Sequence, residues 1–193
     1  GARAPSPPIP LVQSLLPEAG LHLRALDAIA FGRGPGSFTG LRTACSVAQG
    51  LGFGAGVPLL PVDTLLAVAE EARHRFGVKQ VLALLDARME QVYSAAYDFN
   101  AGAAPVAEPQ LGAPEALVLP PGYALAGNAF EAYGDRLPAG APRHPALPTA
   151  GAMLRLAPAL LTDGLTVAPA DAWPLYVRDK VAQTTAERAA AKQ

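Results

Sequence analysis

The sequence is organised around the stretch Gly32-Arg33-Gly34-Pro35-Gly36-Ser37-Phe38-Thr39-Gly40-Leu41-Arg42. The apolar run at 27–31 before it has the length of a strand, and the Ala-rich, Pro-free run at 41–52 after it has the length of a helix. A strand, a glycine-dense turn and a helix in this order gather backbone N–H groups at the start of the helix, where an anion or a partner's carboxylate can dock. Ser37 or Thr39 is the expected N-cap.

The glycine pattern does not match the two commonest nucleotide-binding loops. A P-loop ends in Gly-Lys-Ser/Thr, whereas this loop ends in Thr39-Gly40-Leu41-Arg42. A dinucleotide fingerprint that starts at Gly34 needs Gly or Ala at the position of Thr39. One that starts at Gly32 needs it at the position of Ser37. The pattern therefore favours a tight strand-to-helix connection over a nucleotide cradle.

The composition limits the classes of protein to which the chain can belong. Of its 193 residues 51% are hydrophobic, but no uninterrupted apolar run of about eighteen residues occurs, which argues against a membrane span. The net charge is −1, and Lys and Arg are scattered, so we expect a partner rather than this chain to hold any nucleic acid. The single cysteine, Cys45, excludes an intramolecular disulfide, fits a reducing cytoplasm and is expected to be buried.

Small residues repeat every four positions along the helix predicted for 41–54. Each interior glycine costs a helix roughly 1 kcal/mol relative to alanine, so the helix is expected to gain close backbone approach to another element. That element is either the chain's own sheet or a helix of a partner, and the spacing leaves both open. Two rows have this spacing: Ala44, Ala48, Gly52 and Gly56, and Ser46, Gly50 and Gly54.

Other segments have recognisable patterns. A helix is predicted over 10–19 with Leu11, Val12, Leu15, Leu16 and Ala19 on one face, and another over 64–76. Apolar runs predict strands at 57–62, 80–86, 90–97 and 123–126, with a turn at 86–89 and a surface excursion at 139–148. A further helix is predicted over 149–162, with Thr149 as N-cap and Leu154, Leu156, Leu160 and Leu161 among its buried positions. Trp173 and Tyr176 are the expected packing anchors of the closing segment.

The stretch at 32–42, with Ala-Gln-Gly-Leu at 48–51, resembles the signature of the TsaB (YeaZ) family. Those proteins are non-catalytic partners in making threonylcarbamoyladenosine next to the anticodon of tRNA. Four further segments are similar to the family's pattern: 23–31, 61–65 (Pro-Val-Asp-Thr-Leu), 86–93 (Asp-Ala-Arg-Met-Glu-Gln-Val-Tyr) and 174–178 (Pro-Leu-Tyr-Val-Arg).

The resemblance implies an α/β fold of the two-lobed actin-like or sugar-kinase (RNase H-like) type, with mixed sheets. It places the first lobe, with the interface helices and the glycine-rich loop, at 1–77. The second lobe is at 78–193, and its C-terminal tail is expected to return to the first lobe. Family members begin with a strand hairpin carrying an Asp-x-Ser/Thr turn, and nothing here corresponds to it. We therefore expect this N-terminal hairpin to be missing from the chain.

The resemblance also implies partners. The chain is expected to form a heterodimer with a TsaD-like catalytic subunit, with a small TsaE-like ATPase also engaged. It would bind no cofactor by itself, the complex would use ATP, and tRNA would be reached only through the complex. The implied partner-binding residues are Leu11, Leu15, Ala44, Ala48 and Gly52, so Ala48→Arg is expected to abolish the complex and leave the fold intact. The implied loop residues near the partner's nucleotide are Gly34, Gly36, Ser37, Thr39 and Arg42.

Two other functions compete with the scaffold. A metal- or nucleotide-dependent hydrolase of the glycoprotease type, or a small-molecule kinase, is disfavoured because His22, His74 and His144 are isolated and no metal-ligand spacing occurs. Ser37 lacks the Gly-x-Ser-x-Gly elbow, and Asp86 is the one obvious acidic candidate, more simply interpreted as a turn-stabilising residue. We therefore assign no catalytic and no metal-binding residue. A homodimeric binding protein that uses the same small-residue helices is the other alternative.

Overall fold

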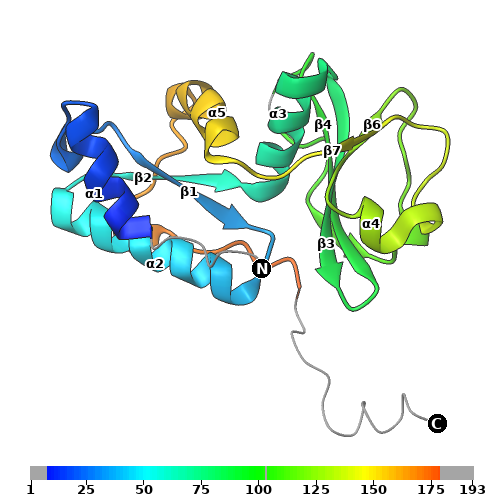
Figure 1. The fold of residues 1–193 in the computed structure, drawn as a ribbon, viewed down its shortest axis with the longest axis horizontal. Helices are drawn as coiled ribbons and strands as arrows, with labels where there is room; N and C mark the ends of the chain where they lie inside the picture. Colours follow the sequence, from blue (N-terminus) through cyan, green and yellow to red (C-terminus); the bar gives the residue numbers. More distant parts are fainter. Residues whose placement is uncertain (1–7, 103, 179–193) are drawn as a thin grey trace, which may run out of the picture.

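The structure is a computed structural model, and it describes residues 8–102 and 104–178. It contains two sheets that lie in separate lobes (Figure 1). In the first lobe, strands β1 (Ile29–Gly34) and β2 (Leu59–Asp63) pair in parallel. Helix α2 (Phe38–Ala55) packs against β1, and α5 (Ala150–Thr162) contacts both strands. Helix α1 (Pro8–Glu18) lies at the same end of the molecule as α2 (Figure 1).

The second lobe contains a five-stranded mixed sheet with the order β5-β4-β3-β6-β7. Its central strand, β3, pairs antiparallel with β4 and parallel with β6. The prediction of an α/β fold with mixed sheets is therefore confirmed. The strands are β3 (Gln80–Arg88), β4 (Gln91–Asp98), β5 (Gln110–Gly112), β6 (Ala124–Gly127) and β7 (Arg143–Pro145).

Both faces of this sheet are covered. Helix α3 (Thr64–Phe76) packs on one face with the alternate residues Val81, Ala83 and Leu85 of β3. Leu82 and Leu84 point to the other face, toward the short helix α4 (Phe130–Tyr133). The near-continuous apolar run of β3 is explained by this burial on both sides. Short 3-10 turns complete the fold: Leu23–Ala25, Pro114–Ala116, Gly134–Arg136 and Pro169–Asp171.

Local signals fix the ends of the long helices. The side-chain oxygen of Ser37 accepts the N–H of Gly40 at 3.5 Å, and that of Thr149 accepts the N–H of Ala152 at 3.1 Å. Gly56 and Gly77 end α2 and α3 with a φ of +72°, a conformation that glycine adopts without strain. No helix within 8–102 and 104–178 is both long and apolar enough to cross a membrane.

Several predicted details are wrong. Leu154 was expected among the buried side chains of α5, but it is 71% exposed, and Trp173 is also exposed instead of anchoring the closing segment. The excursion at 139–148 contains a strand, β7, that its Pro-rich sequence concealed. In α1, Leu11 and Leu15 face solvent while Val12 and Leu16 are half-buried, so the predicted single apolar face divides into two.

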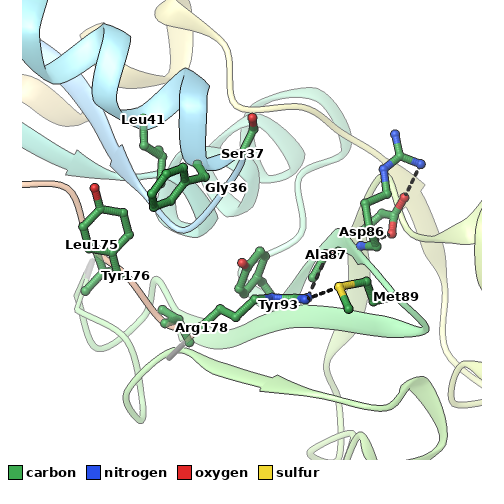
Figure 2. Close-up of a pocket in the computed structure, with 13 residues that line it drawn as sticks. Gly36, Ser37, Leu41, Asp86, Ala87, Met89, Tyr93, Leu175, Tyr176 and Arg178 are labelled. Carbon is green, nitrogen blue, oxygen red and sulfur yellow. Dashed lines mark hydrogen bonds and ion pairs between the residues drawn. The ribbon is translucent and has the colours of Figure 1, made fainter. Parts of the chain in front are cut away.

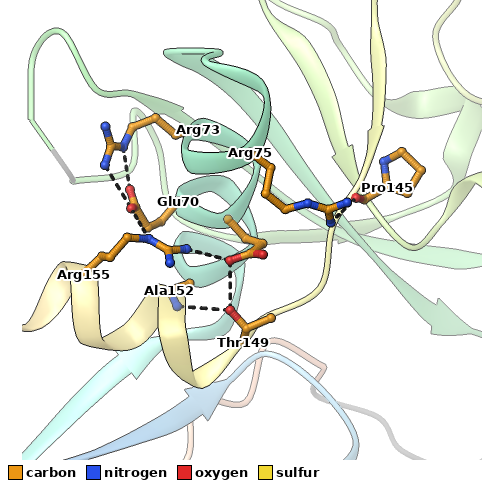
Figure 3. Close-up of polar contacts among 8 residues, drawn as sticks. Glu70, Arg73, Arg75, Pro145, Thr149, Ala152 and Arg155 are labelled. Atoms are coloured by element: carbon orange, nitrogen blue, oxygen red, sulfur yellow. Dashed lines mark hydrogen bonds and ion pairs between the residues drawn. The ribbon is translucent and has the colours of Figure 1, made fainter.

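A polar network joins α3 to α5 (Figure 3). Glu70 is only 2% exposed, and its carboxylate accepts hydrogen bonds from Arg73 at 2.6 Å and from Arg155 at 2.9 Å. The carboxylate of Glu71 accepts from Arg155 at 2.6 Å and from the hydroxyl of Thr149 at 2.9 Å. Burial alone would raise the pKa of Glu71, but the hydrogen bonds from Arg155 and Thr149 hold it below its ordinary value.

We expect acid to weaken the junction between α3 and α5. Because the native pKa of Glu71 is lowered, its contribution to stability is present above the unfolded pKa, about 4.3, and is lost as the pH falls through the lower native pKa. Urea unfolding followed by circular dichroism from pH 7 to pH 3 should therefore show a smaller acid-dependent loss in Glu71→Gln than in the wild type. Glu131→Gln, at an exposed site, is the control variant. Equal losses in wild type and Glu71→Gln would contradict this role.

Candidate functional site

The glycine-rich loop packs under the closing segment of the chain. Gly34 has a φ of +127°, and a Cβ atom there would lie 2.6 Å from the carbonyl oxygen of Leu175. The N–H of Leu175 donates to the carbonyl of Arg33 at 2.7 Å, and the guanidinium of Arg33 pairs with Asp63 at the end of β2. Gly34 therefore supplies both the conformation and the space that this crossing needs.

The closing segment, residues 172–178, connects the two lobes. On the first lobe, the side-chain amide of Gln49 donates to the carbonyl of Ala172 at 3.2 Å, and Arg42 donates to the hydroxyl of Tyr176 at 3.0 Å. On the second lobe, Arg178 donates to the carbonyl of Ala87 at 2.9 Å. The two lobes are thus held together beside the glycine-rich loop.

A cleft of about 480 Å³ lies where the loop, the β3–β4 turn and the closing segment meet (Figure 2). Figure 2 shows the start of α2 on one side, the turn after Asp86 on the other, and Tyr176 and Arg178 along the rim. Its lining includes Ser37, Phe38, Arg88, Met89, Tyr176 and Arg178.

The β3–β4 turn has an unusual backbone. Arg88, Met89 and Glu90 have φ angles of 61°, 53° and 59°, a left-handed conformation that costs a non-glycine residue roughly 1–2 kcal/mol. Asp86 holds the turn, because its carboxylate accepts the N–H of Arg88 and the hydroxyl of Tyr133, each at 2.8 Å. Burial, and then the bond to Asp86, raises the pKa of Tyr133 to about 12. Asp86 is therefore a turn-stabilising residue, as the sequence indicated.

The predicted loop residues have different surroundings. Gly36 and Ser37 line the cleft, and Gly34 is buried behind it. Thr39 and Arg42 are exposed on the first turns of α2. The second-lobe side of the cleft was not predicted, because the residues of the β3–β4 turn meet the loop only in the folded chain.

The predicted partner-binding residues include both exposed and buried positions. Leu11 and Leu15 are each 53% exposed, and Ala44 is half-buried. Ala48 is only 3% exposed and Gly52 is buried, because both face the chain's own core instead of solvent. The prediction that placed these two residues on a surface open to a partner is wrong.

The exposed row of small residues on α2 is the other one. Ser46, Gly50 and Gly54 are exposed, and a Cβ atom at Gly50 or Gly54 would have no neighbour within 4 Å. Phe53, beside this row, is also exposed. The exposed apolar and small residues are therefore Leu11 and Leu15 on α1 and Phe53, Gly50 and Gly54 on α2, two helices at the same end of the molecule.

Histidines, cysteine and carboxylates do not gather into a metal site in the part of the chain that the structure describes. No three of these side chains lie close enough together to hold an ion there. Cys45 is buried, as predicted, and its thiol donates to the carbonyl of Ala172 at 3.3 Å. His144 stacks on Phe76 with the ring centroids 4.5 Å apart.

Comparison with known proteins identifies the family. The "tRNA threonylcarbamoyladenosine biosynthesis protein TsaB" of Escherichia coli (strain K12) is 35% identical over 188 residues, which cover 90% of this chain and 80% of that protein. The chain belongs to the TsaB family. The TsaB of Haemophilus influenzae is 47% identical over 85 residues, 44% of this chain and 36% of that protein.

Solved structures and a family model agree with membership of the TsaB family. "YeaZ from Pseudomonas aeruginosa" superposes with a TM-score of 0.81 at 37% identity, covering 87% of this chain and 81% of that one. A second structure, described as an uncharacterized protein from the same organism with similarity to peptidase YEAZ, has a TM-score of 0.82 at 37% identity and covers 88% and 82%. The family model "TsaD: tRNA N6-adenosine threonylcarbamoyltransferase" matches residues 8–144.

Proposed function

We propose that this chain is a non-catalytic subunit in the biosynthesis of threonylcarbamoyladenosine on tRNA, and that it acts by pairing with a TsaD-type catalytic subunit. The similarity to the E. coli TsaB protein over 90% of the chain supports the pathway. The pairing is supported by the exposed apolar side chains of Leu11 and Leu15 on α1. In this proposal the complex also engages a TsaE-like ATPase, consumes ATP and works in the cytoplasm.

The open surface of α1 and α2 suits a helical partner. Leu11, Leu15 and Phe53 are large apolar groups that are exposed in the isolated chain, and burying the exposed half of each leucine would stabilise a complex by about 0.8–1.5 kcal/mol. Gly50 and Gly54 leave the backbone of α2 accessible, so another helix can approach it closely. Exposed apolar groups beside such a row are typical of a protein–protein interface.

We assign catalysis to the partner because Asp86, the carboxylate that lines the cleft of this chain, is used in hydrogen bonds that hold the β3–β4 turn. Asp86 accepts hydrogen bonds from Arg88 and Tyr133 and holds the strained turn. Ser37, the hydroxyl at the start of α2, accepts the N–H of Gly40. Both groups are thus used to build the fold.

The proposal is tested by reconstitution. Light scattering after size-exclusion chromatography should show a heteromeric peak when the chain is mixed with its TsaD-type partner. Addition of the TsaE-type protein, ATP, the threonylcarbamoyl donor and unmodified tRNA should then yield threonylcarbamoyladenosine, measured by mass spectrometry of the nucleosides. Omission of this chain should remove the product.

Three results would contradict the proposal. A chain that never forms a heteromer, or that forms only a homodimer through the same helices, would favour a self-associating binding protein. Undiminished product without the chain would exclude a required subunit. Nucleotide turnover by the purified chain alone, lost in Asp86→Ala, would favour the hydrolase or kinase alternative.

A further inference from the structure

Three arginines that are far apart in the sequence converge on the cleft between the lobes. Arg88 and Arg178 line it directly. Arg42 lies at the rim, with its guanidinium carbon 3.7 Å from the ring centroid of Phe38 and its Nε bonded to Tyr176 at 3.0 Å. The charges that looked scattered in the sequence are therefore partly gathered in the folded chain.

Among the residues that the structure describes, one ion pair involves these three arginines, the 3.0 Å contact between the guanidinium of Arg88 and the carboxylate of Asp86. The side chain of Asp86 is largely buried and also accepts hydrogen bonds from the backbone N–H of Arg88 and the hydroxyl of Tyr133, whereas the side chain of Arg88 is 86% exposed. Glu90, beyond the turn, pairs with Arg136. The guanidinium of Arg88 thus contacts Asp86 through one nitrogen and has further N–H groups for a ligand, and Arg88 is among the residues that line the cleft.

Aromatic and other apolar side chains line the same cleft as these arginines. Phe38 and Tyr176 lie with their ring centroids 5.8 Å apart, and both line the cleft and are exposed. Met89 is also exposed at the opposite wall. Aromatic faces beside arginines are what proteins use to bind unstacked nucleotides, with bases against the rings and phosphates against the guanidinium groups.

We propose that this cleft binds one unstacked nucleotide of the tRNA, with its phosphate at Arg88 and Arg178 and its base against Phe38 and Tyr176. This inference rests on the proposed function, because it is the tRNA substrate of the complex that brings a flexible loop to the cleft. The volume of about 480 Å³ is within the range of small-molecule sites, about 300–1,000 Å³.

RNA is favoured over a free nucleoside triphosphate by the chemistry of the lining. The loop lacks the lysine of a P-loop, and Asp86, the carboxylate that could hold a magnesium ion, is already bonded to Arg88 and Tyr133. A phosphodiester needs only one or two cations. The backbone of the turn that carries Arg88 is held by the bonds of Asp86 to the N–H of Arg88 and to Tyr133, which reduces the backbone ordering that binding requires.

The test measures the affinity of the reconstituted complex for unmodified tRNA by fluorescence anisotropy at about 0.1 M salt. Arg88→Glu should weaken binding at least about fivefold and reduce the salt dependence by about 0.7–0.9 in the slope of log K against log salt, as expected for one lost phosphate contact. Tyr176→Ala should weaken binding without changing the slope. Ultraviolet cross-linking followed by mass spectrometry should attach RNA to Phe38 or Tyr176.

The matched control is Lys79→Glu, which makes the same charge change at an exposed residue just before β3, at the other end of that strand from Arg88. Equal losses in both variants, or none in Arg88→Glu, would overturn the proposal in favour of non-specific attraction. Competition by free AMP, ADP or ATP at the cleft would assign it to a mononucleotide instead.

Failure of this inference can be separated from failure of the proposed function. If the wild-type complex forms and modifies tRNA while Arg88→Glu binds tRNA normally, only the cleft proposal is wrong. If no complex forms, both are overturned, and the chromatography detects this before any RNA is added.

Discussion

Replacing Leu11 and Leu15 with glutamate is expected to abolish pairing with the TsaD-type subunit while leaving the fold of the chain intact. Both side chains are 53% exposed, so the isolated chain loses little when they become polar. In a complex that buries the exposed half of each side chain, each leucine contributes about 0.8–1.5 kcal/mol, and each glutamate would leave an unpaired charge in an apolar interface. The dissociation constant should therefore rise at least about a hundredfold.

The measurement is light scattering of the mixed subunits after size-exclusion chromatography, with thermal unfolding of each variant alone. The matched control is Leu154→Glu, because Leu154 is also a largely exposed leucine on a helix but belongs to α5. That variant should pair normally. Normal pairing of the α1 double variant, with an unchanged melting temperature, would remove this helix from the interface.

Local sequence signals predicted the elements well. The helix expected at 64–76 matches α3 in both bounds, and the caps Ser37 and Thr149 are where their side chains indicated. These features depend on residues within one turn of each other, so the sequence contains all the information they need. The turn-stabilising role of Asp86 is of the same kind, since its bond to the N–H of Arg88 spans two residues.

Local signals could not predict which face of α2 is buried or which distant residues meet at the cleft. Both four-residue rows on α2 consist of small residues, and only the packing of β2 and the 169–171 turn shows that Ala48 and Gly52 are the inward ones. The convergence of Arg42, Arg88 and Arg178 depends on the closing segment crossing both lobes. No residue spacing in the sequence predicts that the closing segment crosses both lobes.

The burial of Ala48 changes what a substitution at this position would test. With only 3% of its surface exposed, Ala48 has no room for an arginine, and Ala48→Arg would place a charge in the core formed with Cys45 and Leu59. Loss of the complex in that variant would follow from a damaged fold. It therefore gives no information on the interface, and the exposed positions of α1 are the informative ones.

The same geometry predicts that two glycines of one helix respond to alanine in opposite directions. A Cβ atom at Gly52 would lie 2.8 Å from Cδ2 of Leu59, 2.9 Å from Cγ of Pro169 and 3.0 Å from the carbonyl oxygen of Val57. These are a buried side chain, a rigid ring and the backbone, so Gly52→Ala should lower the free energy of unfolding by about 1–3 kcal/mol.

At Gly50 the added methyl group meets nothing within 4 Å, and alanine is the better helix former. Gly50→Ala should therefore raise the free energy of unfolding by roughly 0.5–1 kcal/mol. Urea unfolding of both variants beside the wild type measures the difference, which should reach about 1.5–4 kcal/mol when the two expectations are combined. If Gly52→Ala were as stable as Gly50→Ala, the row that contains Ala48 would not be the inward face of α2. Because each substitution adds one methyl group to the same helix two residues apart, helix propensity contributes equally to both, and packing alone accounts for the opposite signs.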